Sequence, residues 1–377
     1  FNPILIGRVA MGRKIYKLRP MKIATWVFLI TIVTACSPKE TQPTGKSAVI
    51  RKIAFGSCGH QNDAQPVLEL AAAQKPDLFI YLGDNIYSDT YSMDTLRMNY
   101  RILAAKPEFQ ELKASAEILA TWDDHDYGWN DSGRHYPYKE ASKQIFLDFF
   151  GVPDSSVLDH KGIYYSKVFE ARSKTLQIIM LDMRTFRDKL LPYNGNRNDD
   201  PRFNYTLDYS PYGTGDSTML GQEQWTWLEE QLTEAADLRI IGSNTQFGIT
   251  HNGYEAWANF PNEQQKMLDL IRQTQANGVL FISGDVHYAE VSKLSADGLY
   301  PLYDVTASGI TSTWDFATPN DNRIDGPVME NHFGLLTIDW EKSDPDIKME
   351  IHDVTGKVRV SRTVSLSDLT LPQATAN

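Results

Sequence analysis

Five apolar runs in this sequence each end in a short polar segment, and this repeated pattern constrains the fold more than any other feature. The polar segments are Gly56-Ser57-Cys58, Gly83-Asp84-Asn85-Ile86-Tyr87, Asp123-Asp124-His125-Asp126, Leu181-Asp182-Met183-Arg184 and Gly284-Asp285-Val286-His287. Short apolar runs of this kind are typical of strands buried on both faces, and such sheets bind ligands beyond the carboxyl ends of their strands. We therefore expect carboxylates, a thiol, a phenol and imidazoles to meet at one sheet edge and to form a metal site.

The chain between these runs alternates strand and helix patterns, which is typical of strand–helix–strand units in an α/β fold. Strands are predicted at 51–56, 78–82, 117–122, 163–170, 176–182, 238–244 and 279–283. Helices are predicted near 64–73, 93–115, 139–150, 221–236 and 262–276. After residue 289, alternating apolar and polar residues predict a more antiparallel part with one wet face, with strands at 289–294, 302–307, 334–340, 346–353 and 357–364.

One long segment, residues 188–218, shows neither helical nor strand periodicity and is rich in Asn, Asp, Tyr, Gly and Pro. A loop of this length inside a compact domain is usually functional or disordered. Two interpretations stay open, a substrate-side loop or lid and a plain insertion. Its tyrosines could recognise a large alcohol group: Tyr193, Tyr205, Tyr209 and Tyr212.

The net charge narrows the possible functions. The 377 residues include 37 Lys and Arg against 48 Asp and Glu, which gives a formal charge of −11. Phosphate-backbone binding relies on clustered basic side chains, so no nucleic-acid-binding surface is expected. An acidic chain suits an anionic substrate poorly unless many carboxylates bind cations. A generally acidic, soluble surface explains the charge equally well.

The N-terminal segment resembles a bacterial lipoprotein signal. Met21-Lys22 precedes an apolar stretch at 23–33, and small residues then lead to Cys36. The stretch is short for a transmembrane helix, and an uncleaved anchor is the alternative. We expect 1–36 to comprise upstream residues and a signal peptide, Cys36 to carry lipid, and 37–49 to form a flexible tether. The expected location is outside the cytoplasm, on a membrane, at the periplasmic or cell-surface side.

The second cysteine, Cys58, is then alone, which excludes a disulfide with Cys36. A free thiol is either buried as a small apolar group or used as a ligand. Because Cys58 follows a predicted strand and lies two residues after Gly56, the ligand interpretation is favoured.

Three of the polar segments suit metal ligation: those that contain Asp84 and Asp285, and the acidic segment at 123–126. Asp84 at a strand end can bridge two cations, and Tyr87 can reach the same ion across a turn, since phenolate is a hard donor suited to ferric iron. The alternative is that Asp84 caps a following helix and Tyr87 packs in the core. Asp285 and His287 lie on one side of an extended backbone and could bind one ion, or could end an ordinary polar strand.

The segment Asp123-Asp124-His125-Asp126 is the most acidic of the five. Close carboxylates repel one another, so the cluster needs cations unless it is a solvated turn. His125 could protonate a leaving oxygen while a carboxylate orients it. The nearby Trp129-Asn130-Asp131 could add an oxygen ligand. Arg184 could grip a phosphoryl oxygen with both guanidinium nitrogens, or could pair only with Asp182.

Other polar residues are weaker candidates. Asn244-Thr245-Gln246 ends another predicted strand and is expected to serve structure more than ligand binding. Three histidines are expected to lie at the periphery: His60, His135 and His251.

Taken together and in this order, the segments resemble the metallophosphoesterase superfamily and, within it, the alkaline phosphatase D (PhoD-like) family. The matching pieces are Phe55-Gly56-Ser57-Cys58, Leu82-Gly83-Asp84-Asn85-Ile86-Tyr87, Trp122-Asp123-Asp124-His125-Asp126, Leu181-Asp182-Met183-Arg184, Leu220-Gly221-Gln222-Glu223-Gln224-Trp225, Trp227-Leu228 and Gly284-Asp285-Val286-His287. The resemblance covers roughly 50–310, and the order of the motifs is specific.

The resemblance implies a calcineurin-like, four-layer α/β/β/α sandwich of two mixed sheets, with a domain at 50–366 and a tail at 367–377. Two departures from the family are expected to matter for substrate preference. No extra N-terminal β domain, as in larger members, is expected here. Asp126 also stands where those members commonly have Glu.

The resemblance further implies a multinuclear site with ferric iron (Fe³⁺) and calcium (Ca²⁺). The implied ligands are Cys58, Asp84, Tyr87, Asp124, Asp285 and His287. The first three would form the iron side, the last two would complete the calcium side, and Asp84 and Asp124 would be shared. His125 and Arg184 would act on the reacting phosphate.

The function expected on these grounds is hydrolysis of phosphate esters by a metal-bound hydroxide. Small-molecule or lipid phosphate esters are the expected substrates, and the chain is expected to be a monomer. Three alternatives stay open: a phosphodiesterase or phospholipase acting on lipid or polymer diesters, a non-catalytic phosphate- or glycan-binding lipoprotein, and a hydrolase that uses Cys58 as nucleophile.

Overall fold

The computed structural model describes residues 49–196, 202–203, 205–213 and 215–372. The predictions for the signal segment, for Cys36 and for nearly all of the tether lie outside these residues. Within the described ranges, no helix is both long enough and apolar enough to cross a bilayer.

Two mixed sheets form the centre of the described chain. The first sheet has the strand order β15 (Val358–Ser365), β14 (Asp346–Asp353), β13 (His332–Asp339), β1 (Lys52–Gly56), β2 (Leu78–Leu82) and β3 (Glu117–Thr121). The second has the order β12 (Arg323–Val328), β10 (Ala289–Leu294), β11 (Leu302–Ala307), β9 (Val279–Ser283), β8 (Leu238–Ser243), β5 (Lys174–Met180) and β4 (Tyr165–Ala171). A small ribbon joins β6 (Leu191–Pro192) to β7 (Tyr209–Ser210).

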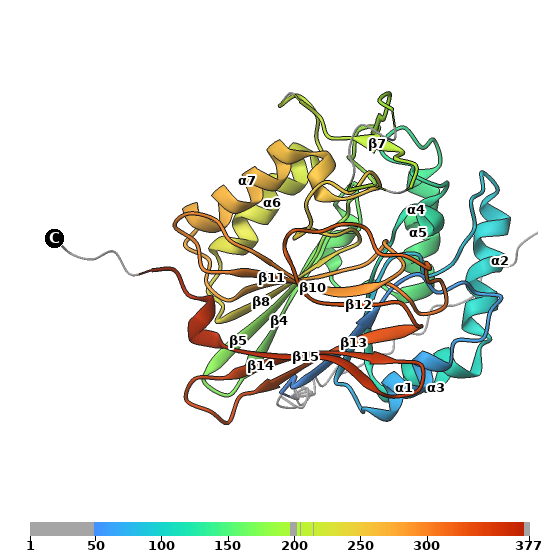
Figure 1. Ribbon diagram of the computed structural model, residues 1–377. Coiled ribbons are helices and arrows are strands. Elements are labelled where there is room, and N and C mark those ends of the chain that lie inside the picture. The colour runs from blue at the N-terminus through green and yellow to red at the C-terminus, as the bar shows by residue number, and fades with distance from the viewer. Residues whose placement is uncertain (1–48, 197–201, 204, 214, 373–377) are drawn as a thin grey trace, which may run out of the picture. The chain divides into compact units, whose positions relative to one another are not determined.

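Helices cover the outer faces of both sheets (Figure 1). Those beside the first sheet are α1 (Pro66–Ala73), α2 (Met93–Ala104), α3 (Pro107–Ser115) and α5 (Lys139–Phe150), while α6 (Gly221–Thr233) and α7 (Pro261–Gln273) lie beside the second. Shorter helices are α4 (Asp124–Tyr127) and the 3₁₀ helices η1 (Ser155–Leu158), η2 (Trp257–Asn259) and η3 (Leu366–Leu369). The predicted α/β/β/α arrangement of two mixed sheets is confirmed.

The apolar runs form the buried strands that the sequence predicts. Every residue of β2, β8 and β9 is buried, as expected for strands covered on both faces. The two sheets also pack closely against each other. A Cβ atom on Gly242 of β8 would lie 3.3 Å from the Leu82 side chain of β2.

The prediction that the polar segments meet at one sheet edge needs a correction. β1, β2 and β3 run parallel in the first sheet, whereas β5, β8 and β9 run parallel in the second. The polar segments therefore come from the carboxyl ends of two facing sheets. Apolar runs report burial on both faces, but they carry no information about which sheet a strand joins.

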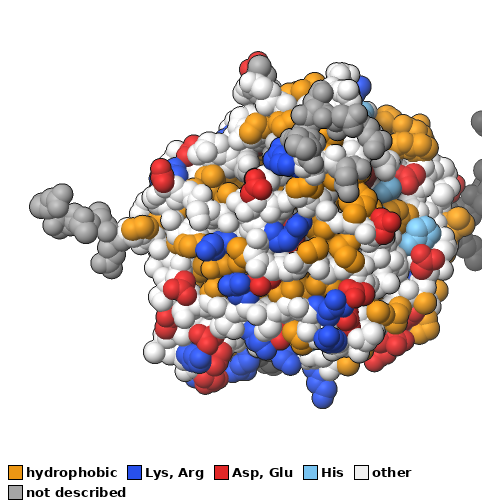
Figure 2. All heavy atoms as spheres, viewed as in Figure 1, with side chains coloured by type: hydrophobic (Ala, Val, Ile, Leu, Met, Phe, Trp, Pro, Cys, Tyr) orange, Lys and Arg blue, Asp and Glu red, His pale blue; other side chains and the backbone are white. Residues whose placement is uncertain are grey.

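The antiparallel part predicted after residue 289 is divided between the sheets. β10 and β12 extend the second sheet, and β13 to β15 extend the first through an antiparallel pair of β13 with β1. β12 was not predicted, nor was the β6–β7 pair inside the long loop. Figure 2 shows acidic and basic side chains interspersed on one face of the molecule. The prediction about nucleic acid concerns the whole surface and stays a prediction.

Candidate metal centre and active site

The first sheet delivers three of the polar segments to one place. Cys58 follows β1, Asp84 follows β2, and Asp124 begins the short helix α4 after β3. Cys58 and Asp84 have left-handed backbones, with φ of 60° and 49°. Non-glycine residues in this conformation are strained and cluster at functional sites. Gly83 makes the close approach possible, because a Cβ there would lie 2.5 Å from the Asp123 Cβ.

The two structural alternatives for these segments are wrong. No helix follows Asp84 directly, since α2 begins at Met93 with Ser92 as its cap. The acidic segment after β3 is not a solvated turn, because Asp123, Asp124 and Asp126 are each at most 3% exposed.

Asp126 has a structural position. Its carboxylate accepts hydrogen bonds from the Asp123 backbone N–H (2.6 Å) and from the amide of Asn85. The first of these forms part of a capping box at the start of α4. The departure from the family's common Glu therefore affects the start of this helix.

Among the described residues, four groups of side chains could hold a metal ion, and a thiol, a carboxylate and an imidazole form the first. Cys58 Sγ lies 3.5 Å from Asp84 Oδ2, and ligand atoms of Cys58, Asp84 and His287 lie within 4.8 Å of one another. The hydroxyl of Tyr87 lies 3.2 Å from His287 Nε2. The predicted iron ligands are therefore brought together, with His287 added to them.

Asp285 and His287 fall in different groups of ligand atoms, and the prediction that both bind one ion stays a prediction. Asp285 instead groups with Asp123 and Asp124. Both residues have left-handed backbones, with φ of 77° at Asp285 and 59° at His287. The backbone is thus not extended here, and residues two apart no longer point to the same side.

Asp84 and Asp124 take part in more than one group. Asp84, Asp124 and His125 form one group, and Asp124, Asp131 and Glu255 form another. Asp84 therefore belongs to two of the four groups and Asp124 to three. This arrangement fits carboxylates that bridge neighbouring cations.

The donor atoms fit cations. Asp84 Oδ1, Asp123 Oδ2 and Asn244 Oδ1 are buried and have no hydrogen-bond partner among the described residues. Unpaired buried oxygens are costly, and a bound cation would satisfy them. Burial, reinforced by Asp124 and Asp126, raises the pKa of Asp84 to about 8. A cation would oppose this shift, because opposite charge favours the ionised carboxylate.

His125 is held at the edge of the same cluster. Its Nδ1 lies 2.9 Å and 2.8 Å from the two carboxylate oxygens of Asp89. Burial acts to lower the pKa of His125, but Asp84, Asp124 and Asp89 outweigh it and raise the pKa to about 11. Sequence reasoning missed Asp89, because it does not follow a strand directly. The only sequence signal for Asp89 is that it is acidic and lies two residues after the Gly83–Tyr87 motif.

The Arg184 guanidinium does not pair with the Asp182 carboxylate, which was one of its two predicted positions. Its guanidinium binds both carboxylate oxygens of Glu255, at 3.0 Å and 2.6 Å, and also contacts Asp123. From Arg184, the Asp182 carboxylate accepts only the backbone N–H, at 2.9 Å. The forked contact thus goes to a protein carboxylate, and Arg184 is 1% exposed. Its predicted contact with a phosphoryl oxygen stays a prediction.

The thiol of Cys58 is buried among oxygen atoms. Ser308 Oγ lies 3.1 Å from the sulfur, and the Asp285 carbonyl lies 3.8 Å from it. Burial and then Asp84 raise the pKa of this thiol well above its usual value. Since a thiolate is the nucleophilic form, the environment disfavours Cys58 as a free nucleophile.

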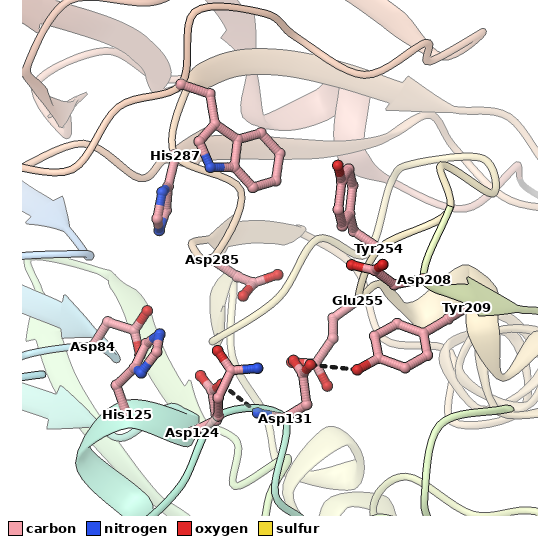
Figure 3. A pocket seen from close by; sticks show the side chains of 12 residues that line it. Asp84, Asp124, His125, Asp131, Asp208, Tyr209, Tyr254, Glu255, Asp285 and His287 are labelled. Atoms are coloured by element: carbon pink, nitrogen blue, oxygen red, sulfur yellow. Dashed lines mark hydrogen bonds between the residues drawn. The ribbon is translucent and has the colours of Figure 1, made fainter. Parts of the chain in front are cut away.

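These groups border a cavity of about 200 Å³ (Figure 3). Its lining residues are Asp84, Asp124, His125, Asn130, Asp131, Asp208, Tyr209, Tyr254, Glu255, Asp285, His287 and Trp314. Asp131 was a possible ligand in the sequence, and Tyr209 was one of the loop tyrosines. Sequence reasoning missed Tyr254, Glu255 and Trp314, which lie in loops without periodicity. Asp208 lies in the long loop 188–218, for which a substrate-side position was one of two open interpretations.

The weaker candidates lie outside this lining. His60 does not line the cavity, but its ring stacks on Tyr87 with ring centroids 5.2 Å apart. Asn244 donates its amide N–H to Asp123, and its own Oδ1 has no hydrogen-bond partner among the described residues, so its expected structural use stays a prediction.

Comparison with known proteins adds the family. The family model described as PhoD-like phosphatase matches residues 53–361. The chain belongs to the PhoD-like phosphatase family. The resemblance drawn from the motifs is thereby confirmed.

Relatives of this PhoD-like chain are distant. Alkaline phosphatase D of Bacillus subtilis (strain 168) is 21% identical over 308 residues, which cover 68% of this chain and 51% of that protein. The chain thus spans about half the length of this curated relative.

Solved structures agree in fold. The structure of PhoD matches with a TM-score of 0.58 and 18% identity, covering 85% of this chain and 72% of that one. GAP50, the anchor in the inner membrane complex of Plasmodium, matches with a TM-score of 0.55 and 12% identity over 87% and 90% of the two chains. A dimetal phosphatase from Danio rerio matches with a TM-score of 0.51 and 15% identity over 84% and 99%.

Proposed function

We propose that this PhoD-like chain hydrolyses phosphate esters in a metal-dependent reaction. One observation carries the proposal: two imidazoles and several carboxylates border a single cavity, and the Cys58 thiol and the Tyr87 phenol contact two of them, Asp84 and His287. Fold alone does not decide function, and a similar fold occurs in GAP50, which is an anchor. The site is therefore the basis of the proposal.

We propose ferric iron and calcium as the metals. Cys58, Asp84, Tyr87 and His287 would hold the iron, because phenolate and thiolate suit it. Asp124 and Asp285, with oxygen donors only, would hold the harder calcium ion. When bound, such cations polarise phosphoryl oxygens and lower the pKa of water that attacks the ester.

The chain's own residues would orient the substrate and move one proton. Asp89 fixes Nδ1 of His125 and leaves Nε2 available to protonate the departing oxygen. Glu255 and Asp123 hold Arg184 beside the carboxylates, which keeps Asp124 in place. Arg184 is in this respect a positioning residue.

A phosphodiester preference is the second candidate. It is favoured by the extension of the cavity past the carboxylates to Tyr254 and Trp314, where the second alcohol of a diester would fit. The candidate substrates are then soluble, lipid or polymer diesters.

We also propose that lipid on Cys36 anchors a monomer outside the cytoplasm, at the periplasmic or cell-surface side. The apolar stretch before Cys36 supports this proposal. Incorporation of labelled palmitate that Cys36→Ser abolishes is the expected result. A soluble, unlabelled chain would overturn it.

Hydrolysis of p-nitrophenyl phosphate and bis-p-nitrophenyl phosphate tests the activity. Protein from Ser37 onward, purified without chelator, is assayed before EDTA, after EDTA, and after calcium and ferric iron are added back. Activity that vanishes and returns is expected, and the faster ester identifies the class. Iron-loaded protein that hydrolyses neither ester would overturn the proposal in favour of a phosphate-binding protein.

A further inference from the structure

The cavity also has an aromatic end, where the ring of Trp314 packs against His287 with centroids 5.3 Å apart. Tyr254 and Trp314 border it, with ring centroids 5.0 Å apart and planes inclined at 48°. Each ring is supported from outside the cavity. Tyr205 stacks on Tyr254 at 5.3 Å, and Phe316 stacks on Trp314 at 5.3 Å. The two rings are therefore held by packing, and both are partly exposed where they line the cavity.

A carboxylate lies beside these rings. Asp208 is next to Tyr254 in Figure 3, on the far side of Asp285 from Asp84 and His125. Its backbone is fixed, since its N–H donates to the Gly253 carbonyl at 2.9 Å and its carbonyl accepts from Tyr193 at 2.9 Å. No side-chain hydrogen bond or ion pair to its carboxylate occurs among the residues that the structure describes.

The charge of the cavity makes Asp208 unusual. Its twelve lining residues include six carboxylates and no Lys or Arg. Glu255 is paired with Arg184 and Arg187, and Asp131 accepts the hydroxyl of Tyr209. Asp84, Asp124 and Asp285 belong to the proposed metal groups. Among the described residues, Asp208 is the lining carboxylate that has neither a charged partner nor a place in a ligand group, and its side chain is exposed.

We propose that Tyr254, Trp314 and Asp208 form a subsite for an organic ammonium group on the alcohol part of the substrate. The faces of aromatic rings attract cations, and a quaternary ammonium held among such rings is a known mode of recognition. The subsite selects phosphate esters of amino alcohols, such as choline esters. This inference rests on the proposed function, because it names the substrate class of that same site.

A neutral aromatic alcohol fits the observations less well. Stacking on Tyr254 and Trp314 would need no carboxylate, and a neutral group would make no use of the charge of Asp208. An ammonium group uses the rings and the charge together.

Two isosteric substrates separate these possibilities. p-Nitrophenyl phosphorylcholine and p-nitrophenyl 3,3-dimethylbutyl phosphate differ only in the nitrogen or carbon at the branch point, and hence in charge. With the metal-loaded protein we expect kcat/KM to be about tenfold higher for the choline ester. Equal values would overturn the subsite. Failure to hydrolyse either of them, or bis-p-nitrophenyl phosphate, would instead overturn the proposed function.

Substitutions assign the preference to residues. Asp208→Asn is expected to bring the ratio of the two kcat/KM values to within about threefold of one. Asp216→Asn is the matched control, since it removes the same charge from the same loop at an exposed position that does not line the cavity. Tyr254→Leu should lower the ratio, whereas Tyr254→Phe should keep it. An unchanged ratio in both Asp208→Asn and Tyr254→Leu would contradict the proposal.

A binding measurement provides a readout independent of turnover. Calorimetric titration with choline and with its neutral isostere 3,3-dimethylbutanol should show tighter binding of choline, and Asp208→Asn should remove the difference. Equal binding by the unsubstituted chain would overturn the subsite. Hydrolysis of glycerophosphocholine against dispersed phosphatidylcholine then distinguishes a soluble ester from a lipid as the source of the choline group.

Discussion

The two ends of the cavity are built in different ways. At one end, Asp84 is buried and Asp285 partly buried, and both have left-handed backbone just after parallel strands. At the other end, Asp208 is exposed and Tyr254 partly buried, and both come from loops. Side chains on a rigid sheet edge are held in place by the core, while loops can change without disturbing it. The comparison assigns the chemistry to the strand ends and substrate choice to the loops.

The largest effect is expected at the strand end. Because Asp84 belongs to two of the four ligand groups, Asp84→Asn should lower kcat by about 10³-fold and reduce the bound metal. Metal content by mass spectrometry and hydrolysis of bis-p-nitrophenyl phosphate measure both. Asp216→Asn controls for loss of charge. Full metal content, with activity within tenfold of that of the unsubstituted chain, would contradict the assignment of metal binding and chemistry to the strand end.

The second effect concerns the ion pairs that join the two ends. Glu255→Ala removes a partner of the buried Arg184 and Arg187, so the free energy of unfolding in urea should fall by about 3 kcal/mol. Glu341→Ala is the comparison, because its pair with Arg51 is about half exposed and should contribute less than about 1 kcal/mol. Similar losses in the two variants would contradict the buried role of Glu255.

The third effect is a dependence of folding stability on pH, caused by a buried histidine that is linked to Cys58 through Ser308. His332 accepts the Ser308 N–H at Nε2 (2.9 Å), and Ser308 in turn contacts Cys58. Burial lowers the pKa of His332 from 6.5 to about 4. The unfolded chain therefore binds a proton more readily, and stability present above pH 6.5 is lost as the pH falls toward 4.

This change in the pKa of His332 corresponds to about 3 kcal/mol at most. Unfolding free energies of the unsubstituted chain and of His332→Gln, measured between pH 4 and 8, should differ in slope over that range. Parallel curves would show that His332 is not the titrating group.

The smallest effect is expected at the loop end. Tyr209→Phe removes the hydroxyl that Asp131 accepts, and a hydrogen bond to a charged group contributes about 1.5–3 kcal/mol when buried and less when half-exposed. We expect kcat/KM to fall by less than about tenfold with metal content unchanged. A loss as large as that of Asp84→Asn would place the loop end in the chemistry.

The sequence alone determined most strands, most helices and the strand-end part of the site. Apolar runs identified β1, β2, β3, β5, β8 and β9, and the polar residues after them include Cys58, Asp84, Asp124 and Asp285. This was possible because burial on both faces and the position of a strand end are local properties, written in consecutive residues.

The tertiary structure alone decided the rest. It divided the strands between two sheets and placed His287 and Asp285 in different ligand groups. It also paired the Arg184 guanidinium with Glu255 and brought Asp89, Asp208 and Tyr254 to the site. Strand pairing, left-handed backbone and loop packing depend on residues far apart in the chain. No periodicity records such contacts, so a sequence can show where a strand ends without showing what that end will face.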